Sequence, residues 1–320
     1  MTVHIGVVGT GMIGRDHIRR LTDVVAGAEV VAVTDVDAEL AREAAAGVGA
    51  RALPTGQDVI DDPGVDAVVV TSWGPTHAEY VLAAIAAGKY VFCEKPLATT
   101  AADCLRIVEA EQASGRRLVQ VGFMRRYDVG YQEMKQALSG LGPVLLMHCA
   151  HRNPSVPTEY HSDMAIQDTA VHEIDIIRWL LDEEIATAQV VVPKQTTRKF
   201  EHLRDPQVML FDTESGVRID LEVFVNCQYG YDVRHETVCE AGAVRLPDPG
   251  LLHSWKQRFG AAFDTEFTEW VSSVQAGNLV GPTAWDGYAV AVTSDATVEA
   301  RRTGKTVSVR LKDRPAFYGS

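Results

Sequence analysis

The chain has 320 residues, of which 46% are hydrophobic and 23% charged, a composition ordinary for a globular protein of one or two domains. Its 30 Lys and Arg against 43 Asp and Glu give a net charge of -13, which argues against nucleic acid or an anionic membrane as the main partner. We find no secretory signal, no apolar run long enough to cross a bilayer and no CxxC pair among the five cysteines, so we expect a cytoplasmic protein with reduced thiols.

The first motif is a glycine-rich loop. Residues 4–9 predict a short strand, and residues 15–21 predict a helix directly after Gly9-Thr10-Gly11-Met12-Ile13-Gly14. A GxGxxG string is weak alone, but a strand before it and a helix after it are typical of dinucleotide binding. The glycines permit a tight turn, close approach of a pyrophosphate and close helix–strand packing. The expected contacts with the dinucleotide in this loop are Gly9, Gly11, Met12, Ile13 and Gly14.

The second predicted strand, residues 30–35, ends in Asp35. A carboxylate about 20 residues beyond the loop can accept hydrogen bonds from a ribose 2′-hydroxyl and would repel a 2′-phosphate. The next residue is Val36, so no arginine is placed to hold that phosphate. We therefore predict NAD rather than NADP. The alternative is that Asp35 only caps the following helix.

Strands and helices continue to alternate up to Gly122, which predicts a doubly wound parallel sheet, a Rossmann fold, over residues 1–122. Ligands of such sheets bind at the carboxyl ends of the strands. The loop after the strand at 65–71 and the Glu94-Lys95-Pro96 segment both lie there, and Lys95 is expected to point into the cofactor cleft. The further expected cofactor contacts are Thr71, Ser72, His77, Glu94 and Lys95.

The pattern changes after residue 122. A helix ending near Ser139 is followed by several strands with little helix between them, and two long helices are expected over 259–275 and 285–302. This order predicts an α+β unit, residues 123–320, with a large and mostly antiparallel sheet. We expect the first domain to bind the cofactor and the second to bind the substrate.

Residues 167–181 predict an amphipathic helix on which Asp168 and His172 lie one turn apart. A carboxylate beside an imidazole can move a proton near neutral pH. Asp175 falls on nearly the same face. The alternative is a surface pair or a buried histidine. Other polar residues expected to converge near Asp168 are Arg125, His151, Asn153 and Tyr231.

Each of these residues also has a structural alternative. Arg125 could pair with Asp128, and His151 could pack at a strand end. His148 and His151 have HxxH spacing, but on a strand they point to opposite faces, and no cysteine pair completes a zinc site. We therefore expect no metal.

With GTGMIG, Glu94-Lys95-Pro96 and DTAVHEID (residues 168–175) in place, the sequence resembles the Gfo/Idh/MocA oxidoreductase family. Longer strings are similar to the myo-inositol 2-dehydrogenases within it. These strings are VGFMRRYD (121–128), AHRNP (150–154), NCQYGYD (226–232) and GPTAWDGY (281–288).

The resemblance implies a catalytic trio of Lys95, Asp168 and His172, in which His172 takes the hydroxyl proton of a polyol. It implies NAD as cofactor, oxidation of myo-inositol to 2-keto-myo-inositol, and a homotetramer formed through the second sheet. The implied substrate contacts are Arg125, Asn153, Asp168, His172, Asp175 and Tyr231. The alternatives are a dehydrogenase of scyllo-inositol, D-chiro-inositol or an aldose, and a non-catalytic NAD(H)-binding sensor.

Overall fold

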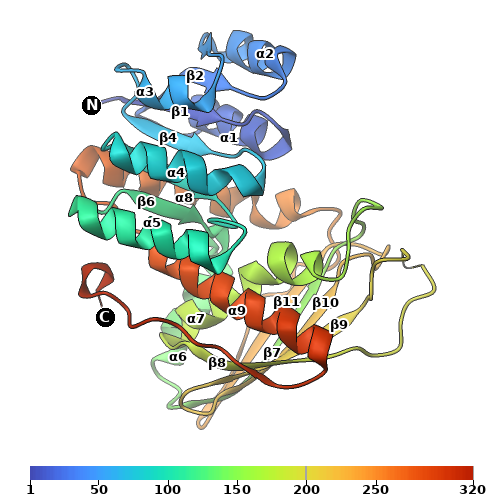
Figure 1. Cartoon of the computed structure of the whole chain (residues 1–320). Coiled ribbons are helices and arrows are strands. Elements are labelled where there is room, and N and C mark those ends of the chain that lie inside the picture. The colour runs from blue at the N-terminus through green and yellow to red at the C-terminus, as the bar shows by residue number, and fades with distance from the viewer. Residues whose placement is uncertain (199, 320) are drawn as a thin grey trace. The chain divides into compact units, whose positions relative to one another are not determined.

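The structure is a computed structural model that describes residues 1–198 and 200–319 (Figure 1). The chain divides into two units. The first comprises Met1–Phe123, Phe263–Tyr288 and Asp313–Ser320, and the second comprises Met124–Ala262 and Ala289–Lys312. The division expected at residue 122 stays a prediction. No helix in the described part of the chain is long and apolar enough to span a membrane.

The first unit is built on a parallel sheet in the order β3-β2-β1-β4-β5-β6. Its central strands are apolar and fully buried, as strands covered on both faces must be. The strands are β1 (Val3–Val8), β2 (Ala28–Thr34), β3 (Arg51–Ala52), β4 (Ala67–Val70), β5 (Tyr90–Glu94) and β6 (Val119–Gly122). The order reverses at β1 and β4, so the predicted doubly wound Rossmann fold is confirmed.

The helices of this unit follow the expected order. They are α1 (Met12–Asp23), α2 (Ala38–Val48), α3 (Gly56–Asp61), α4 (His77–Ala86) and α5 (Ala101–Ser114), and α4 and α5 lie side by side (Figure 1). The sequence did not predict β3 and α3, because a two-residue strand and a six-residue helix are too short to show periodicity. Only the capping box of Thr55 and Asp58 signals α3.

The core of the first unit includes residues from far along the chain. Phe267, Trp270 and Val271 are almost fully buried against the strand residues Ile5 and Phe92. They lie on the long helix α8 (Trp255–Ala276). The core of the first unit is therefore completed by a helix that follows most strands of the second sheet in sequence.

The second unit contains a sheet in the order β12-β11-β7-β10-β9-β8-β13. Only the β7–β10 pair is parallel, so the predicted mostly antiparallel sheet is confirmed. The strands are β7 (Val144–Arg152), β8 (Ile185–Val191), β9 (Gln207–Thr213), β10 (Arg218–Phe224), β11 (Asp232–Cys239), β12 (Gly242–Arg245) and β13 (Val307–Ser308). Burial alternates along β9 and β10, so one face of the sheet packs on the core.

The helices of the second unit differ from the expectation at the most important point. The helix expected from residue 167 begins as a π-helical turn, Ala165–Ala170, and becomes α-helical only in α7 (Val171–Leu181). The prediction of a regular α-helix through Asp168 was therefore wrong. Other helical segments are the 3₁₀ turn η2 (Met124–Tyr127), α6 (Val129–Leu138) and α9 (Ala284–Thr303).

The charged residues of α7 do not face solvent. Its charged residues Glu173, Asp175 and Arg178 are buried, because each has an oppositely charged partner. These partners are Arg125, Arg126 and Glu184, respectively. The charged positions of α7 are therefore buried ion pairs.

Candidate active site

The glycine-rich loop connects β1 to α1 in the geometry that a phosphate needs. Gly9 has φ +100°, and a Cβ there would lie 2.5 Å from the backbone nitrogen of Ser72. A Cβ on Gly14 would lie 2.1 Å from the carbonyl oxygen of Gly9. A Cβ on Gly11, in contrast, would meet nothing within 4 Å. Gly9 and Gly14 therefore serve the fold, while Gly11 leaves open space over the backbone at the N-terminus of α1.

Asp35 follows β2 and lies beside this loop. Its Oδ2 accepts hydrogen bonds from the backbone N–H of Thr10 at 2.6 Å and from the Thr10 hydroxyl at 3.2 Å. The N-cap of α2 is Asp37, whose side chain accepts from the backbone of Glu39. Because Asp37 caps α2, Asp35 is not the residue that caps this helix. Val36 is fully exposed next to it, and Met12 on the loop is 66% exposed.

Thr71, Ser72 and His77 hold together the loop after β4. The Thr71 hydroxyl donates to the carbonyl oxygen of Gly9 at 2.7 Å. His77 places Nδ1 2.7 Å from the carbonyl oxygen of Pro96 and Nε2 2.9 Å from that of Ser72. Burial lowers the pKa of His77, and a neutral ring has one N–H to share between these two carbonyls. His77 therefore links the loops after β4 and β5.

Glu94 and Lys95 stand at the carboxyl end of β5. Glu94 Oε1 lies 2.7 Å from Nε2 of His17, and Oε2 accepts the backbone N–H of Lys95 at 3.1 Å. His17 is on α1 and is fully buried. Sequence reasoning missed it, although it follows Gly14 by one helical turn and so lies on the buried face of α1.

All of the expected cofactor residues thus lie at the carboxyl ends of β1, β2, β4 and β5 within one unit. They offer what a dinucleotide requires: an open helix N-terminus for the phosphates and a carboxylate beside it for a ribose hydroxyl. The open space at Gly11, which any side chain would fill, fits a bound dinucleotide.

Asp168 and His172 lie in the second unit, on the π-helical turn and on α7. A third residue, Tyr160, binds the same turn. Its hydroxyl lies 3.1 Å from Asp168 Oδ2, 2.8 Å from the Met164 carbonyl oxygen and 2.8 Å from the Thr169 hydroxyl. Burial and the nearby Asp168 carboxylate raise the pKa of Tyr160, so its single proton stays available to be donated. Sequence reasoning missed Tyr160 because it precedes the helix and reaches the turn only in the fold.

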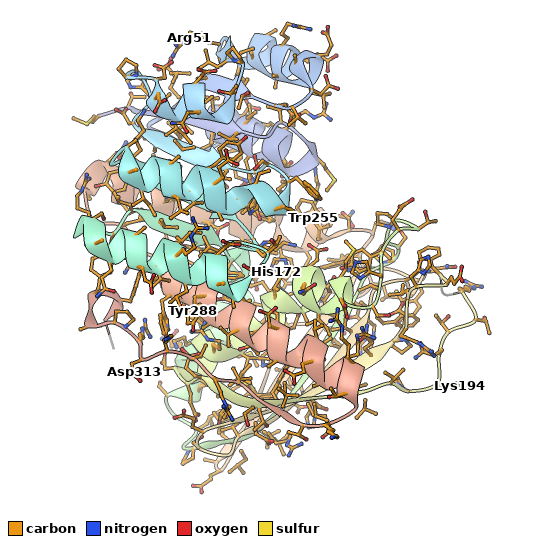
Figure 2. All side chains as sticks on the ribbon, viewed as in Figure 1. Arg51, His172, Lys194, Trp255, Tyr288 and Asp313 are labelled. Carbon is orange, nitrogen blue, oxygen red and sulfur yellow. The ribbon has the colours of Figure 1, made fainter. Side chains whose placement is uncertain are left out.

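A buried cluster of Arg125, His151 and Glu173 lies close to His172 of α7, which is labelled in Figure 2. Arg125 and His151 both contact Glu173: Arg125 Nη1 bonds one carboxylate oxygen, and His151 Nδ1 is 3.0 Å from the other. Burial by itself would raise the pKa of Glu173, but Arg125 and His151 outweigh it and the pKa is lowered. The His151 and His172 ring centroids are 6.5 Å apart. Glu173 was not expected from the sequence to belong to the site.

Tyr231 also belongs to this cluster, since its ring packs edge-on against His151 with centroids 5.6 Å apart. Burial raises its pKa to about 12. Arg125 does not pair with Asp128, which is bound by Arg258 instead. The residues expected to converge therefore include three that contact one another or share a partner: Arg125, His151 and Tyr231.

Asn153 and Asp175 are placed differently. The Asn153 backbone is fixed between Phe224 and Cys227, and its side chain is half-buried. Asp175 is fully buried, and Arg126 Nε donates to it at 2.9 Å. A role of either residue in substrate binding stays a prediction. Lys95 belongs to the first unit, whereas Asp168 and His172 belong to the second, so their meeting around a substrate also stays a prediction.

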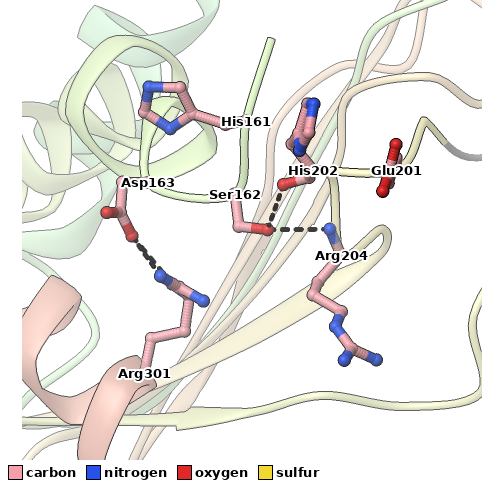
Figure 3. A pocket seen from close by; sticks show the side chains of 7 residues that line it. All are labelled: His161, Ser162, Asp163, Glu201, His202, Arg204 and Arg301. Atoms are coloured by element: carbon pink, nitrogen blue, oxygen red, sulfur yellow. Dashed lines mark hydrogen bonds and ion pairs between the residues drawn. The ribbon is translucent and has the colours of Figure 1, made fainter.

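A pocket of about 270 Å³ lies just before the π-helical turn (Figure 3). Its walls are largely occupied by internal bonds: Arg301 Nε donates to Asp163 at 2.9 Å, and the Ser162 hydroxyl accepts from the Arg204 backbone at 2.8 Å. These contacts fix the segment that leads into Asp168. Among the described residues, no group of three or more His, Cys, Asp or Glu could hold a metal ion.

Comparison with known proteins covers the whole chain. Residues 3–123 match the family GFO_IDH_MocA, described as an oxidoreductase family with an NAD-binding Rossmann fold. Residues 131–245 match the GFO/IDH/MocA C-terminal domain, and residues 251–309 match the C-terminal alpha/beta domain of the oxidoreductase family.

Individual relatives are similar over their full length. Inositol 2-dehydrogenase 3 of Saccharopolyspora erythraea is 64% identical, with 100% of this chain and 99% of that protein covered. Inositol 2-dehydrogenase of Ralstonia nicotianae is 54% identical, with 99% of each covered. The myo-inositol dehydrogenase of Lactobacillus casei, solved with NAD(H) and myo-inositol, has a TM-score of 0.97 and 41% identity, with 99% of this chain and 100% of that chain covered. With its dinucleotide-type loop, its two-unit architecture and these matches along its length, the chain belongs to the Gfo/Idh/MocA family of NAD-dependent oxidoreductases.

Proposed function

We propose that the protein is an NAD-dependent inositol 2-dehydrogenase that oxidises myo-inositol to 2-keto-myo-inositol. The observation that carries this proposal is the full-length likeness to the Lactobacillus casei myo-inositol dehydrogenase, whose structure contains NAD(H) and myo-inositol. The names of the relatives at 64% and 54% identity support the same activity. The scyllo-inositol dehydrogenases among similar structures are 24% identical, which supports a shared fold only.

In this proposal His172 is the general base that takes the proton from the substrate hydroxyl. Asp168 orients the imidazole and stabilises its protonated form, and Tyr160 holds Asp168 through the contact at 3.1 Å. Lys95 donates a hydrogen bond to the same substrate oxygen and so favours the charge that develops there. NAD⁺, when bound, supplies the acceptor for the hydride. The groups that would hold it are the loop Gly9–Gly14, Asp35, Thr71, Ser72, His77 and Glu94.

Substrate recognition would depend on hydrogen bonds rather than on a net charge. The charges of Arg125 and Glu173 cancel within their own buried pair, and the same is true of Arg126 and Asp175. Inositol is neutral and rich in hydroxyl groups, so such a site suits it. A site that hydrogen-bonds several hydroxyls can reject an analogue lacking one by about 10⁴-fold. We assign this role to Arg125, Asn153, Asp175 and Tyr231, together with Asp168 and His172.

A polyol panel tests the function. The purified protein would be mixed with NAD⁺ and, separately, myo-inositol, scyllo-inositol, D-chiro-inositol or glucose, and NADH formation would be followed by absorbance. The largest kcat/KM is expected for myo-inositol. A larger value for another polyol would replace the substrate, and NADH binding without turnover on any polyol would favour a sensor.

We also propose that the protein is a cytoplasmic homotetramer that associates through the outer face of the second sheet. This face carries half-exposed apolar residues between charged ones, such as Leu210 and Phe224 beside Glu222. Light scattering coupled to gel filtration should give four times the chain mass. Replacing Leu210 and Phe224 together by Glu should give a smaller species.

A further inference from the structure

We infer that His17 is a positioning residue for Lys95 and that it acts through Glu94. The inference rests on the proposed function, because it concerns how the lysine of the proposed trio is held. It adds a residue that neither touches the substrate nor belongs to the glycine-rich loop. All of the residues that carry it lie in the first unit.

The contacts of His17 fix which ring nitrogen carries the proton. Arg20 Nη1 lies 2.9 Å from His17 Nδ1, and a guanidinium can only donate, so Nδ1 must be the acceptor. The proton of a neutral ring is therefore on Nε2, which faces Glu94 Oε1 at 2.7 Å. The result is a directed chain in which Arg20 donates to His17 and His17 donates to Glu94.

The surroundings keep this chain in one arrangement. His17 is fully buried between the rings of Phe92, Phe263 and Phe267. Burial lowers its pKa against the opposing effect of Glu94, so the ring stays neutral and keeps its single donor. Arg20 is itself held by Asp264, at 2.6 Å from its Nε, and by Asp16, at 3.0 Å from its Nη2.

Glu94 connects this series of hydrogen bonds to Lys95. One oxygen accepts from His17, and the other accepts the backbone N–H of Lys95 at 3.1 Å. On the other side of Lys95, the Pro96 carbonyl oxygen lies 2.7 Å from His77 Nδ1. The backbone on both sides of Lys95 is thus tied to a buried histidine. Without the donor on His17, the carboxylate of Glu94 would be free to rotate and to release the Lys95 backbone.

Two substitutions at residue 17 separate this role from simple packing. His17→Leu removes both the donor and the acceptor, whereas His17→Gln can return an N–H to Glu94. Tyr318→Phe is the matched control, because it removes another buried hydrogen bond of the same unit, from the Tyr318 hydroxyl to Glu111 at 2.7 Å. Wild type and variants would be compared in kcat, in the Kd for NADH, and in hydrogen–deuterium exchange of the peptide that contains residues 94–97.

We expect His17→Leu to lower kcat by about 100-fold, as a small displacement of a reacting group does. The Kd for NADH should rise far less than kcat falls, because Glu94 is only one of the groups that would hold the cofactor, and His17→Gln should recover most of kcat. Glu94→Gln combined with His17→Leu should cost no more than the larger single effect, since both act through one contact. Exchange at residues 94–97 should rise in His17→Leu but not in Tyr318→Phe. Full kcat in His17→Leu, or additive losses in the double variant, would overturn the inference.

The exchange measurement also keeps the two proposals apart. If the wild type oxidises no polyol, the proposed function fails, and exchange alone decides whether His17 holds the Lys95 segment. Unchanged exchange at residues 94–97 would then reject the inference. If His17→Leu does not fold, His17→Asn, which is too short to reach Glu94, takes its place against His17→Gln with the same expectations.

Discussion

Each unit contains a buried cluster of an arginine, a histidine and a glutamate, but the order of contacts differs. In the first unit the histidine is in the middle: Arg20 donates to His17, and His17 contacts Glu94. In the second unit the three groups all contact one another: Glu173 is bound by both Arg125 and His151, and Arg125 Nη2 also lies 3.1 Å from His151 Nδ1. The same three residue types are therefore arranged as a linear relay in one unit and as a closed set of mutual contacts in the other.

The difference affects where charge is left over. Arg20 is paired with Asp16 and Asp264, so it does not offset the carboxylate of Glu94 at the carboxyl end of β5. Arg125 is balanced by Glu173 itself, and the second cluster has no such surplus. The first arrangement suits a cluster that holds a charged side chain such as Lys95 near a cofactor. The second suits the recognition of a neutral polyol.

The largest expected effect is the loss of kcat on replacing His172 of the second unit, while NADH binding by the first unit remains. His172→Ala should lower kcat by about 10³- to 10⁴-fold, because general base catalysis contributes that much at its upper range. NADH binding, measured by fluorescence titration, should survive. The matched control is His4→Ala, which removes a half-exposed histidine at the N-terminal end of β1. Retained turnover would remove His172 from the role of base.

The two clusters should also respond differently to neutralisation. Glu173→Gln leaves the buried Arg125 charge without its partner, so the free energy of unfolding should fall by about 3–5 kcal/mol. Glu94→Gln leaves Arg20 with both of its aspartates and should cost less than half as much. Urea denaturation of the two variants and the wild type measures the difference. Equal losses would mean that the order of contacts does not matter.

Cofactor choice depends on the first unit alone. Asp35→Ser with Val36→Arg removes a negative charge and places a cation at a fully exposed position. A hydrogen bond to a charged group contributes about 1.5–3 kcal/mol, so kcat/KM should shift toward NADP by about 10- to 100-fold. The ratio of kcat/KM with the two cofactors is the measurement. An unchanged ratio would show that Asp35 does not select NAD through the ribose 2′-hydroxyl.

The smallest expected effect concerns His235, which is buried on β11 near the second cluster. Burial lowers its pKa to about 4 from the ordinary 6.5. The folded state therefore prefers the neutral ring. The stability that this preference contributes is fully present above pH 6.5 and is lost as the pH falls toward 4. Between pH 8 and pH 5 the loss through this residue should be about 2 kcal/mol. His235→Asn should flatten the dependence of urea denaturation on pH, and an unchanged dependence would contradict the assignment.

Local signals made much of the first unit predictable. A few neighbouring residues are enough to recognise the GTGMIG loop, the strand ending in Asp35 and the Glu94-Lys95-Pro96 segment. The parallel sheet follows from the alternation of predicted strands and helices. The short elements β3 and α3 were not predictable, because two to six residues show no period.

The second unit was less predictable because its polar contacts join distant segments. Tyr160 bonds Asp168 on the π-helical turn, and the buried Glu173 pairs with Arg125 and His151, which come from other elements. Nothing in residues 168–181 alone distinguishes a charged face in water from one paired inside the protein. In the first unit, His17 and Arg20 were missed for the same reason, since they interact with Glu94 and Asp264.

The nucleotide-binding unit is assembled from three separate stretches of the chain. Phe267, Trp270 and Val271 complete a core begun by residues near the N-terminus, and Tyr318 bonds Glu111 close to the last residue. A chain truncated after residue 123 would therefore form a sheet whose apolar side chains lack the cover of α8. During synthesis on the ribosome this unit cannot complete its core until Phe267, Trp270 and Val271 have been translated, so a stop before residue 267 would damage a sheet formed by much earlier residues.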